Sequence, residues 1–264
     1  MMVKQKDLLQ HIPKEEHSFA EMILDMCQQV EETYTFRLTR FLNPKQEEIV
    51  RMLGARFHLQ VFSSQEFLET EFSRCILAPE YYQLDSEDFK IRLLEIQYPQ
   101  KFYSLTHSQV LGTLLNRLGM KRDFLGDIIF NDGTCLILID TKFSLLAQQE
   151  IQRIGRVPIK WKEQELSKWS GEASVSYPTK QILVSSLRLD KVVAVSFSLS
   201  RSQAVNLIES GHVKVDYSPS QQVSKALTIG QLVSVRGFGR VRLKEKVGYS
   251  KQGKLKIEIE IIRK

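Results

Sequence analysis

The chain has 264 residues, of which 42% are hydrophobic and 26% are charged. This composition is typical of a globular protein, and the length suffices for one large domain or two to three small ones. The first residues are charged throughout, and no apolar run approaches the roughly 18 residues that a membrane-spanning helix needs. We therefore expect no secretory signal and no membrane partner.

The three cysteines, Cys27, Cys75 and Cys135, lie far apart in the chain and show no CxxC spacing. An odd number of widely spaced cysteines argues against a disulfide framework. We expect buried, reduced thiols in a protein of the cytoplasm.

The net charge of +6 is unevenly distributed along the chain. Residues 1–181 hold 22 Lys and Arg against 25 Asp and Glu, whereas residues 182–264 hold 15 against 6, so the two parts carry −3 and +9. The C-terminal third therefore carries the whole positive excess. Such asymmetry favours a polyanionic partner for that region, although a basic domain that is merely soluble is an open alternative.

The first part of the chain indicates a small α/β domain over residues 1–75. Apolar residues recur at spacings of three and four on one face of a helix; they are Phe19, Met22, Ile23, Met26, Cys27 and Val30. Asn43 and Pro44 predict the N-cap and first turn of a second helix that ends near Gly54. Residues 57–62 alternate like a strand.

Residues 76–169 predict a ferredoxin-like β-α-β-β-α-β domain, the arrangement that RNA recognition motifs also use. A strand at 89–98 precedes a helix capped by Thr106 or Ser108 and ended at Gly119. Two strands then flank a hairpin turn at Asp132 and Gly133, a helix covers 142–154, and a strand at 157–161 closes the sheet. This fold serves many functions and settles none.

A polar stretch at 170–181 is expected to be a linker to the basic region, which completes an α+β chain of three parts. Short helices are predicted at 186–195 and 199–211, the second with a capping box of Ser200 and Gln203 and a left-handed stop at Gly211. Three strands should follow, at 212–217, at 232–245 with bends at its glycines, and at 254–262.

A pattern of residues at fixed spacings runs through the basic region. It begins with Arg188, Leu189, Asp190 and Lys191, and continues with Ser200, Arg201, Ser202, Gln203, Ala204, Leu207, Ile208, Gly211, Val213 and Val215. By this pattern residues 182–264 resemble the S4-type RNA-binding domain. Gly230-Gln231 replaces the usual Gly-Asp, and Asp216-Tyr217 replaces the common Asn-Gly, which weakens the turns rather than the basic face. The match covers about 50 residues at several fixed spacings, and it implies that the C-terminal domain binds structured RNA.

The resemblance implies RNA contacts near the starts of the two helices and on the strand that follows them. The helix residues are Arg188, Lys191, Ser200, Arg201 and Gln203, and the strand residue is Lys214. Arginine suits this role because its planar fork binds phosphate oxygens in pairs, and the second helix adds amide donors at its N-terminus. Asp190 is expected to start the first helix or to orient an arginine rather than to touch RNA.

A basic ribbon follows the predicted strand at 232–245, and it can track a phosphate backbone. Its members are Arg236, Arg240, Arg242, Lys244 and Lys246. A solvated strand face is the alternative explanation. The stretch RGFGRVRL begins like the aromatic strand of an RNA recognition motif, but Arg240 stands where an aromatic residue is required, so we treat that likeness as accidental.

Four short motifs stand out in the first half of the chain. They are RFLNP at 40–44, THSQVLG at 106–112, GMKR at 119–122 and GDI at 126–128. With the order of the domains, they make the chain similar to the bacterial YlmH family. The resemblance implies an N-terminal α/β part, a central RNA-binding domain and an S4-type domain. It further implies that the partners are rRNA, tRNA and the large ribosomal subunit. The implied process is ribosome-associated quality control, in which large subunits obstructed by peptidyl-tRNA are bound and C-terminal tails are added to stalled chains.

An RNA-modifying enzyme of the pseudouridine synthase or methyltransferase type, with S4-mediated substrate binding, is the alternative function. A scaffold whose basic tail only adds solubility is a third. No GxGxxG follows a strand, no GxxxxGK[ST] occurs, and the five histidines form no HExxH or Cys/His cluster. We therefore expect no catalytic residue, metal, cofactor or small-molecule substrate.

His107, Lys121 and Arg122 are candidates for a second RNA patch, with a helix cap and an exposed loop as alternatives.

Overall fold

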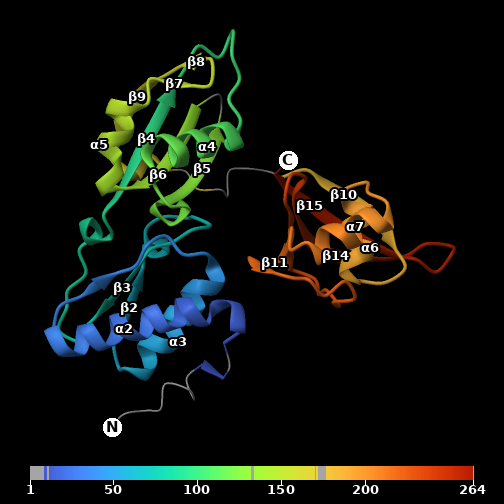
Figure 1. Cartoon of the computed structure of the whole chain (residues 1–264), viewed down its shortest axis with the longest axis horizontal. Coiled ribbons are helices and arrows are strands. Elements are labelled where there is room, and N and C mark those ends of the chain that lie inside the picture. The colour runs from blue at the N-terminus through green and yellow to red at the C-terminus, as the bar shows by residue number, and fades with distance from the viewer. Residues whose placement is uncertain (1–8, 11, 132–133, 170, 172–176, 264) are drawn as a thin grey trace. The chain divides into compact units, whose positions relative to one another are not determined.

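The computed structural model describes residues 9–10, 12–131, 134–169, 171 and 177–263 (Figure 1). The chain divides into two compact units, residues 1–175 and 176–264. Among the described residues, no helix combines the length and apolar composition that crossing a membrane requires.

The first sheet of unit 1 has the strand order β1-β3-β2 and is antiparallel. Its strands are β1 Arg37–Leu38, β2 Gln60–Ser63 and β3 Cys75–Ala78, with helices α2 His17–Thr33 and α3 Pro44–Arg56 beside them (Figure 1). The predicted boundary between residues 75 and 76 thus falls inside β3. Short 3₁₀ helices cover Lys14–Glu16 and Ser64–Glu66.

The apolar stripe predicted for α2 does form part of the core. Ile23, Cys27 and Val30 are buried, whereas Met22 is exposed. Asn43 caps α3 in a capping box with Gln46, as the Asn-Pro pair predicts.

The second sheet of unit 1 confirms the β-α-β-β-α-β arrangement, with antiparallel order β5-β6-β4-β9. Its strands are β4 Ile91–Gln97, β5 Leu125–Asn131, β6 Thr134–Asp140 and β9 Lys160–Gln164, and its helices are α4 His107–Leu118 and α5 Thr141–Glu150. Thr106 caps α4, and Gly119 ends it in the left-handed conformation. The predicted turn residues Asp132 and Gly133 lie outside the described residues.

Two bounds in this part were predicted wrongly. Helix α5 ends at Glu150 rather than near Ile154, because a small hairpin of β7 Arg153–Ile154 and β8 Val157–Pro158 follows it. The closing strand β9 consequently starts at Lys160 instead of 157. Further 3₁₀ helices cover Ser86–Phe89, Arg122–Phe124 and Leu166–Lys168.

Both faces of the second sheet are covered. Leu94, Ile96 and Ile137 pack in one core cluster with Val110 and Leu114 of α4. The opposite face contributes to a second cluster that reaches the first sheet; its members include Phe41, Ile76, Leu93, Leu136, Leu138 and Trp169. This double burial explains why residues 135–140 form an almost unbroken apolar run.

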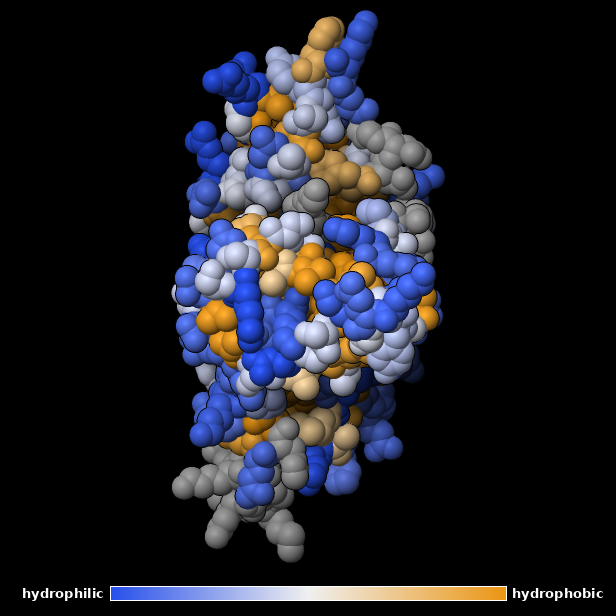
Figure 2. Space-filling model, turned by 90° about the vertical axis from the view of Figure 1, so that its right-hand side faces the viewer, coloured by the Kyte–Doolittle hydropathy of each residue, from blue (hydrophilic) through white to orange (hydrophobic). Residues whose placement is uncertain are grey.

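Unit 2 is a six-stranded sheet, in the order β10-β15-β14-β13-β11-β12, with two helices packed on it. The strands are β10 Thr179–Val184, β11 Val213–Val215, β12 Ser218–Pro219, β13 Leu232–Val235, β14 Gly239–Tyr249 and β15 Leu255–Arg263, and the helices are α6 Leu189–Ser196 and α7 Arg201–Glu209. The predicted linker therefore overlaps β10 at residues 179–181, while residues 170 and 172–176 lie outside the described part. In the view of Figure 2, hydrophilic residues cover most of the surface and hydrophobic ones appear in small areas.

The single strand predicted over 232–245 is wrong, because the chain reverses there and forms the β13–β14 hairpin. Gly237 and Gly239 have φ of 84° and 113°, a backbone region that L side chains rarely adopt. These glycines therefore make a turn rather than bends in one strand.

The three cysteines are buried and free, as predicted. Burial raises the pKa of Cys27 and Cys135 to about 12, with the charge of Glu31 adding to the effect at Cys27. The thiols are therefore protonated at neutral pH and poor nucleophiles.

Candidate nucleic-acid interface

The starts of α6 and α7 meet at the side chain of Asp190. Arg188 is the N-cap of α6, and Arg201 is the first residue of α7. The first turn of α6 is held by the backbone N–H groups of Leu189 and Asp190, which donate to the carbonyls of Lys225 and Val223 at 2.9 and 3.2 Å. The two arginines are therefore attached to fixed points of the fold.

Both guanidinium groups bond to the same carboxylate. Arg188 donates from Nε to Asp190 Oδ1 at 3.0 Å and from Nη2 to Oδ2 at 3.3 Å. Arg201 donates from Nη2 and Nε to Oδ2 at 3.2 and 3.3 Å. Asp190 thus orients two arginines toward one place, in agreement with the role predicted for it.

The carboxylate is buried while the arginines reach solvent. The side chain of Asp190 is 0% exposed, against 38% for Arg188 and 69% for Arg201. Burial alone would raise the pKa of Asp190, but hydrogen bonds and charges from Arg188 and Arg201 hold it below its usual value. The same carboxylate raises the pKa of Arg188. The cluster therefore presents two fixed cations above one buried anion.

Ser200 and Gln203 fix the start of α7 through the predicted capping box. Ser200 Oγ accepts from the Gln203 N–H at 3.2 Å, and Gln203 Oε1 accepts from the Ser200 N–H at 2.9 Å. These contacts position Arg201, and the expected RNA contact of either residue stays a prediction. Lys191 is half-buried on α6, and Lys214 is exposed on β11 between two buried valines.

The predicted basic ribbon is partly engaged with its own surroundings. Arg236 is exposed in the β13–β14 turn, and the guanidinium of Arg240 lies 5.9 Å from the ring centre of Tyr217. Arg242 and Lys244 both face Glu260, at 3.6 and 3.9 Å. Lys246 donates to the hydroxyl of Tyr249 at 2.7 Å. Glu260 thus offsets part of the charge of the ribbon.

The second patch predicted from His107, Lys121 and Arg122 is not brought together. His107 begins α4, whereas the other two follow its C-terminal end, and a helix of that length spans about 18 Å. Arg122 donates to the carbonyl of Leu125, and its guanidinium lies 4.5 Å from the ring centre of Phe72. Lys121 and Arg122 line a depression of about 380 Å³ that His107 does not reach.

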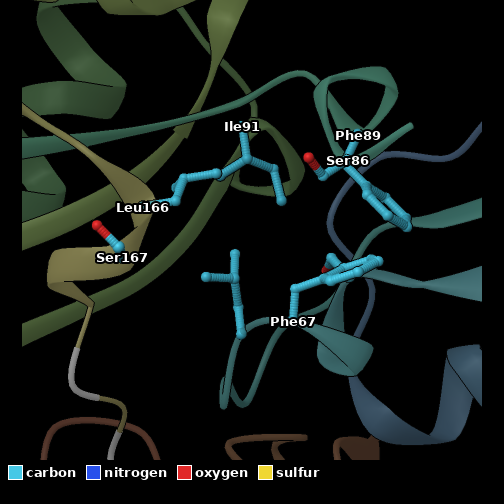
Figure 3. Close-up of a pocket in the computed structure, with 8 residues that line it drawn as sticks. Phe67, Ser86, Phe89, Ile91, Leu166 and Ser167 are labelled. Carbon is cyan, nitrogen blue, oxygen red and sulfur yellow. The ribbon is translucent and has the colours of Figure 1, made fainter. Parts of the chain in front are cut away.

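An apolar pocket of about 200 Å³ lies in unit 1 (Figure 3). In Figure 3 the rings of Phe67 and Phe89 lie on one side, with Ile91 and Leu166 on the other. Hydroxyls of Ser64, Ser86 and Ser167 complete the lining, and no ionisable side chain joins them. This lining offers no group for acid–base catalysis at neutral pH. Among the described residues, no cluster of His, Cys, Asp or Glu could hold a metal ion.

The sequence did not indicate one further pair of basic residues. Arg117 of α4 and Arg153 of β7 line a common groove. They are far apart in the chain and belong to no motif, so only the packing of α4 beside β7 brings them together.

Three family models match the chain in succession. "YlmH, N-terminal" covers residues 15–82, "Putative RNA-binding domain in YlmH" covers 85–168, and "S4 domain" covers 187–233. The last span includes Arg188, Asp190 and Arg201.

Two known proteins are similar to the chain. A Bacillus subtilis (strain 168) protein named "Ribosome-associated protein quality control protein P2" is 30% identical over 254 residues, or 96% of this chain and 98% of that protein. The solved structure of "Cell division protein ylmH from Streptococcus pneumoniae" is 37% identical, with a TM-score of 0.55 over 60% of this chain and 96% of that one.

Proposed function

Since the chain belongs to the YlmH family, we propose that it is a non-enzymatic RNA-binding factor of translation that acts in the cytoplasm. Its RNA partners are rRNA and tRNA on the large ribosomal subunit. Its role is the rescue or quality control of stalled ribosomes, with C-terminal tailing of the nascent chain.

The name of the Bacillus subtilis relative supports the ribosome as partner and quality control as the process. The S4 match supports RNA as the ligand of unit 2. The observation that carries the proposal is the arginine pair on Asp190, because one buried carboxylate holds two solvent-accessible arginine side chains inside the matched span.

The cluster acts on the RNA backbone. A guanidinium group that a carboxylate binds on one edge can donate its remaining N–H groups to phosphate oxygens in charge-assisted hydrogen bonds. Because both forks are fixed before RNA arrives, less side-chain entropy is lost on binding. Phosphate contacts of this kind set the position of a protein on RNA and carry no base sequence themselves. We therefore expect recognition by shape.

The proposal is tested with the triple variant Arg188→Gln, Asp190→Asn and Arg201→Gln. Replacing all three residues avoids leaving a buried carboxylate without its partners. The net charge changes by only −1, and Arg56→Gln, at the exposed C-terminal residue of α3, is the matched control. We expect the triple variant to bind isolated large ribosomal subunits and bulk tRNA at least about tenfold more weakly, since each hydrogen bond to a charged group contributes about 1.5–3 kcal/mol. The control should bind like the wild type.

If amide NMR shows that unit 2 of the triple variant is folded and the variant still binds RNA with wild-type affinity, the proposed RNA site at Asp190 is wrong. Affinity that does not respond to added salt would contradict phosphate recognition. Mass analysis of bulk RNA incubated with the chain and common methyl donors tests the non-enzymatic assignment, and any new modification would overturn it.

A further inference from the structure

The central part of unit 1 has the strand order of an RNA recognition motif, but the sheet face that such motifs use is closed. Those motifs stack bases on aromatic residues of the two middle strands. Here β4 and β6 are the middle strands, and on that face they carry Leu93, Leu136 and Leu138, which are buried against Phe41 and Trp169. An RNA ligand of this domain therefore has to bind elsewhere.

An open groove lies on the opposite, helical side of the same sheet, between α4 and the β7–β8 hairpin. It encloses about 470 Å³. Its lining consists of Ser108, Gln109, Gly112, Thr113, Asn116, Arg117, Arg153 and Gly155. The side chains of this lining carry hydroxyl, amide and guanidinium groups, and no large apolar side chain contributes.

Four other arginines of unit 1 are engaged by carboxylates. Arg40, Arg51, Arg74 and Arg92 each form an ion pair with a carboxylate. Within the part of the chain that the structure describes, neither Arg117 nor Arg153 has such a pair, and both are exposed. Arg156 adds a third exposed guanidinium in the turn beside Gly155. The groove and its rim thus carry three exposed guanidinium groups, and among the described residues none of the three forms an ion pair with a carboxylate.

We propose that the groove between α4 and the β7–β8 hairpin binds the phosphate backbone of RNA, with Arg117 and Arg153 as its anchoring cations. The inference rests on the proposed function in taking RNA as the partner. Backbone contacts to nucleic acid come mainly from Arg and Lys with Ser, Thr, Asn and Gln, which is the composition of this lining. A protein partner would favour aromatic or other apolar anchors, and the lining has none.

Gly112 provides a direct way to block the groove. A Cβ at this position would meet no atom within 4 Å, and the residue lies in the interior of α4. A side chain is therefore tolerated by the packing, and helix propensity favours it over glycine. Gly112→Glu places a carboxylate in the groove without removing any contact of the fold.

The test measures binding of the full chain to bulk tRNA and to isolated large ribosomal subunits across a salt series. The variants are Arg117→Gln with Arg153→Gln, and separately Gly112→Glu. Two lost phosphate contacts should weaken binding at least about tenfold and make the log–log salt slope shallower by about 1.4–1.8, at about 0.7–0.9 per contact. Lys14→Gln with Arg56→Gln removes the same charge from exposed positions outside the groove. It should change affinity by no more than about twofold, because salt screens distant charges.

Unchanged binding by both groove variants, while the triple variant at Arg188, Asp190 and Arg201 loses affinity, would overturn this inference and leave the proposed function standing. The reverse result would support the groove and remove the site in unit 2. Equal loss in the groove variants and the Lys14 and Arg56 control would also overturn the inference, because overall charge would then explain the effect.

Discussion

Arg74 in unit 1 and the arginine pair in unit 2 each bond to an aspartate that is removed from solvent, yet their guanidinium groups have opposite surroundings. Arg74 pairs with Asp140 at 2.9 Å, with side-chain exposures of 6% and 10%. It also donates to the carbonyls of Thr39 and Lys90, and burial lowers its pKa. Arg188 and Arg201 keep 38% and 69% of their side chains exposed over a buried Asp190.

The difference shows how one chemical pair serves two purposes. Arg74 lies between the two sheets of unit 1, where it bonds to backbone on either side, so it joins them as part of the structure. In unit 2 the carboxylate is the buried member, and the arginines extend from it to the surface. We propose that exposure of the cation, rather than the presence of an Arg–Asp pair, distinguishes the RNA site of unit 2 from the structural ion pair of Arg74.

Removing Arg74 should give the largest effect. Arg74→Ala leaves Asp140 buried without its cation, which costs about 3–5 kcal/mol of the free energy of unfolding. Both tryptophans, Trp161 and Trp169, lie in unit 1, so their emission during urea unfolding reports this unit alone.

Arg92→Ala is the control for Arg74→Ala, because Arg92 pairs at the surface with Glu87 and Glu163. Arg92→Ala should lower the free energy of unfolding by no more than about 1 kcal/mol. Similar losses for the two variants would show that burial does not distinguish these ion pairs.

Asp190→Asn should have a smaller effect on stability and a specific effect on binding. The asparagine amide cannot accept hydrogen bonds from both guanidinium groups as the carboxylate does. We therefore expect the free energy of unfolding of unit 2 to fall by about 1–3 kcal/mol, and RNA binding to weaken at temperatures where unit 2 is folded. Hydrogen exchange of α6 and α7 gives the stability, and tRNA binding gives the affinity.

Glu260→Gln is the matched control for Asp190→Asn. It also removes one negative charge beside two cations, but the contacts of Glu260 with Arg242 and Lys244 are longer, at 3.6 and 3.9 Å. We expect equal or tighter RNA binding for this variant, because local positive charge rises and Asp190 still holds Arg188 and Arg201. If Asp190→Asn likewise tightens binding, then charge, and not the orientation of the arginines, governs recognition.

The features that sequence predicted well are those set by local spacing. The N-cap at Asn43 was visible from the Pro44 that follows it, Thr106 was one of two caps considered for α4, and the capping box of Ser200 and Gln203 was visible because its partners lie three residues apart. Apolar periodicity also indicated α2. Asp190 was assigned correctly because it stands between its arginines within a short motif.

Features that depend on chain reversal or long-range packing could not be predicted in this way. Strand-like residues lie on both sides of Gly237 and Gly239, and these glycines were interpreted as bends in one strand, so the sequence did not reveal the β13–β14 hairpin. Arg74 and Asp140 are paired only after two sheets pack together. His107 and Lys121 seemed close in sequence, but a rigid helix separates them.

The smallest expected effect is the acid dependence of the Asp190 contribution. The arginines hold the pKa of Asp190 below its ordinary value of 3.8 against the effect of burial, so the ionised form favours the folded state. The stabilisation is therefore complete above about pH 4 and is lost as pH falls through the lower folded pKa. We expect the stability difference between wild type and Asp190→Asn, followed by resolved amide NMR signals of α6 and α7, to stay constant from pH 7 to about 4 and to shrink below it. A difference that instead grew on acidification would mean that Asp190 is protonated more easily in the folded chain, and that the two arginines do not hold it as an anion.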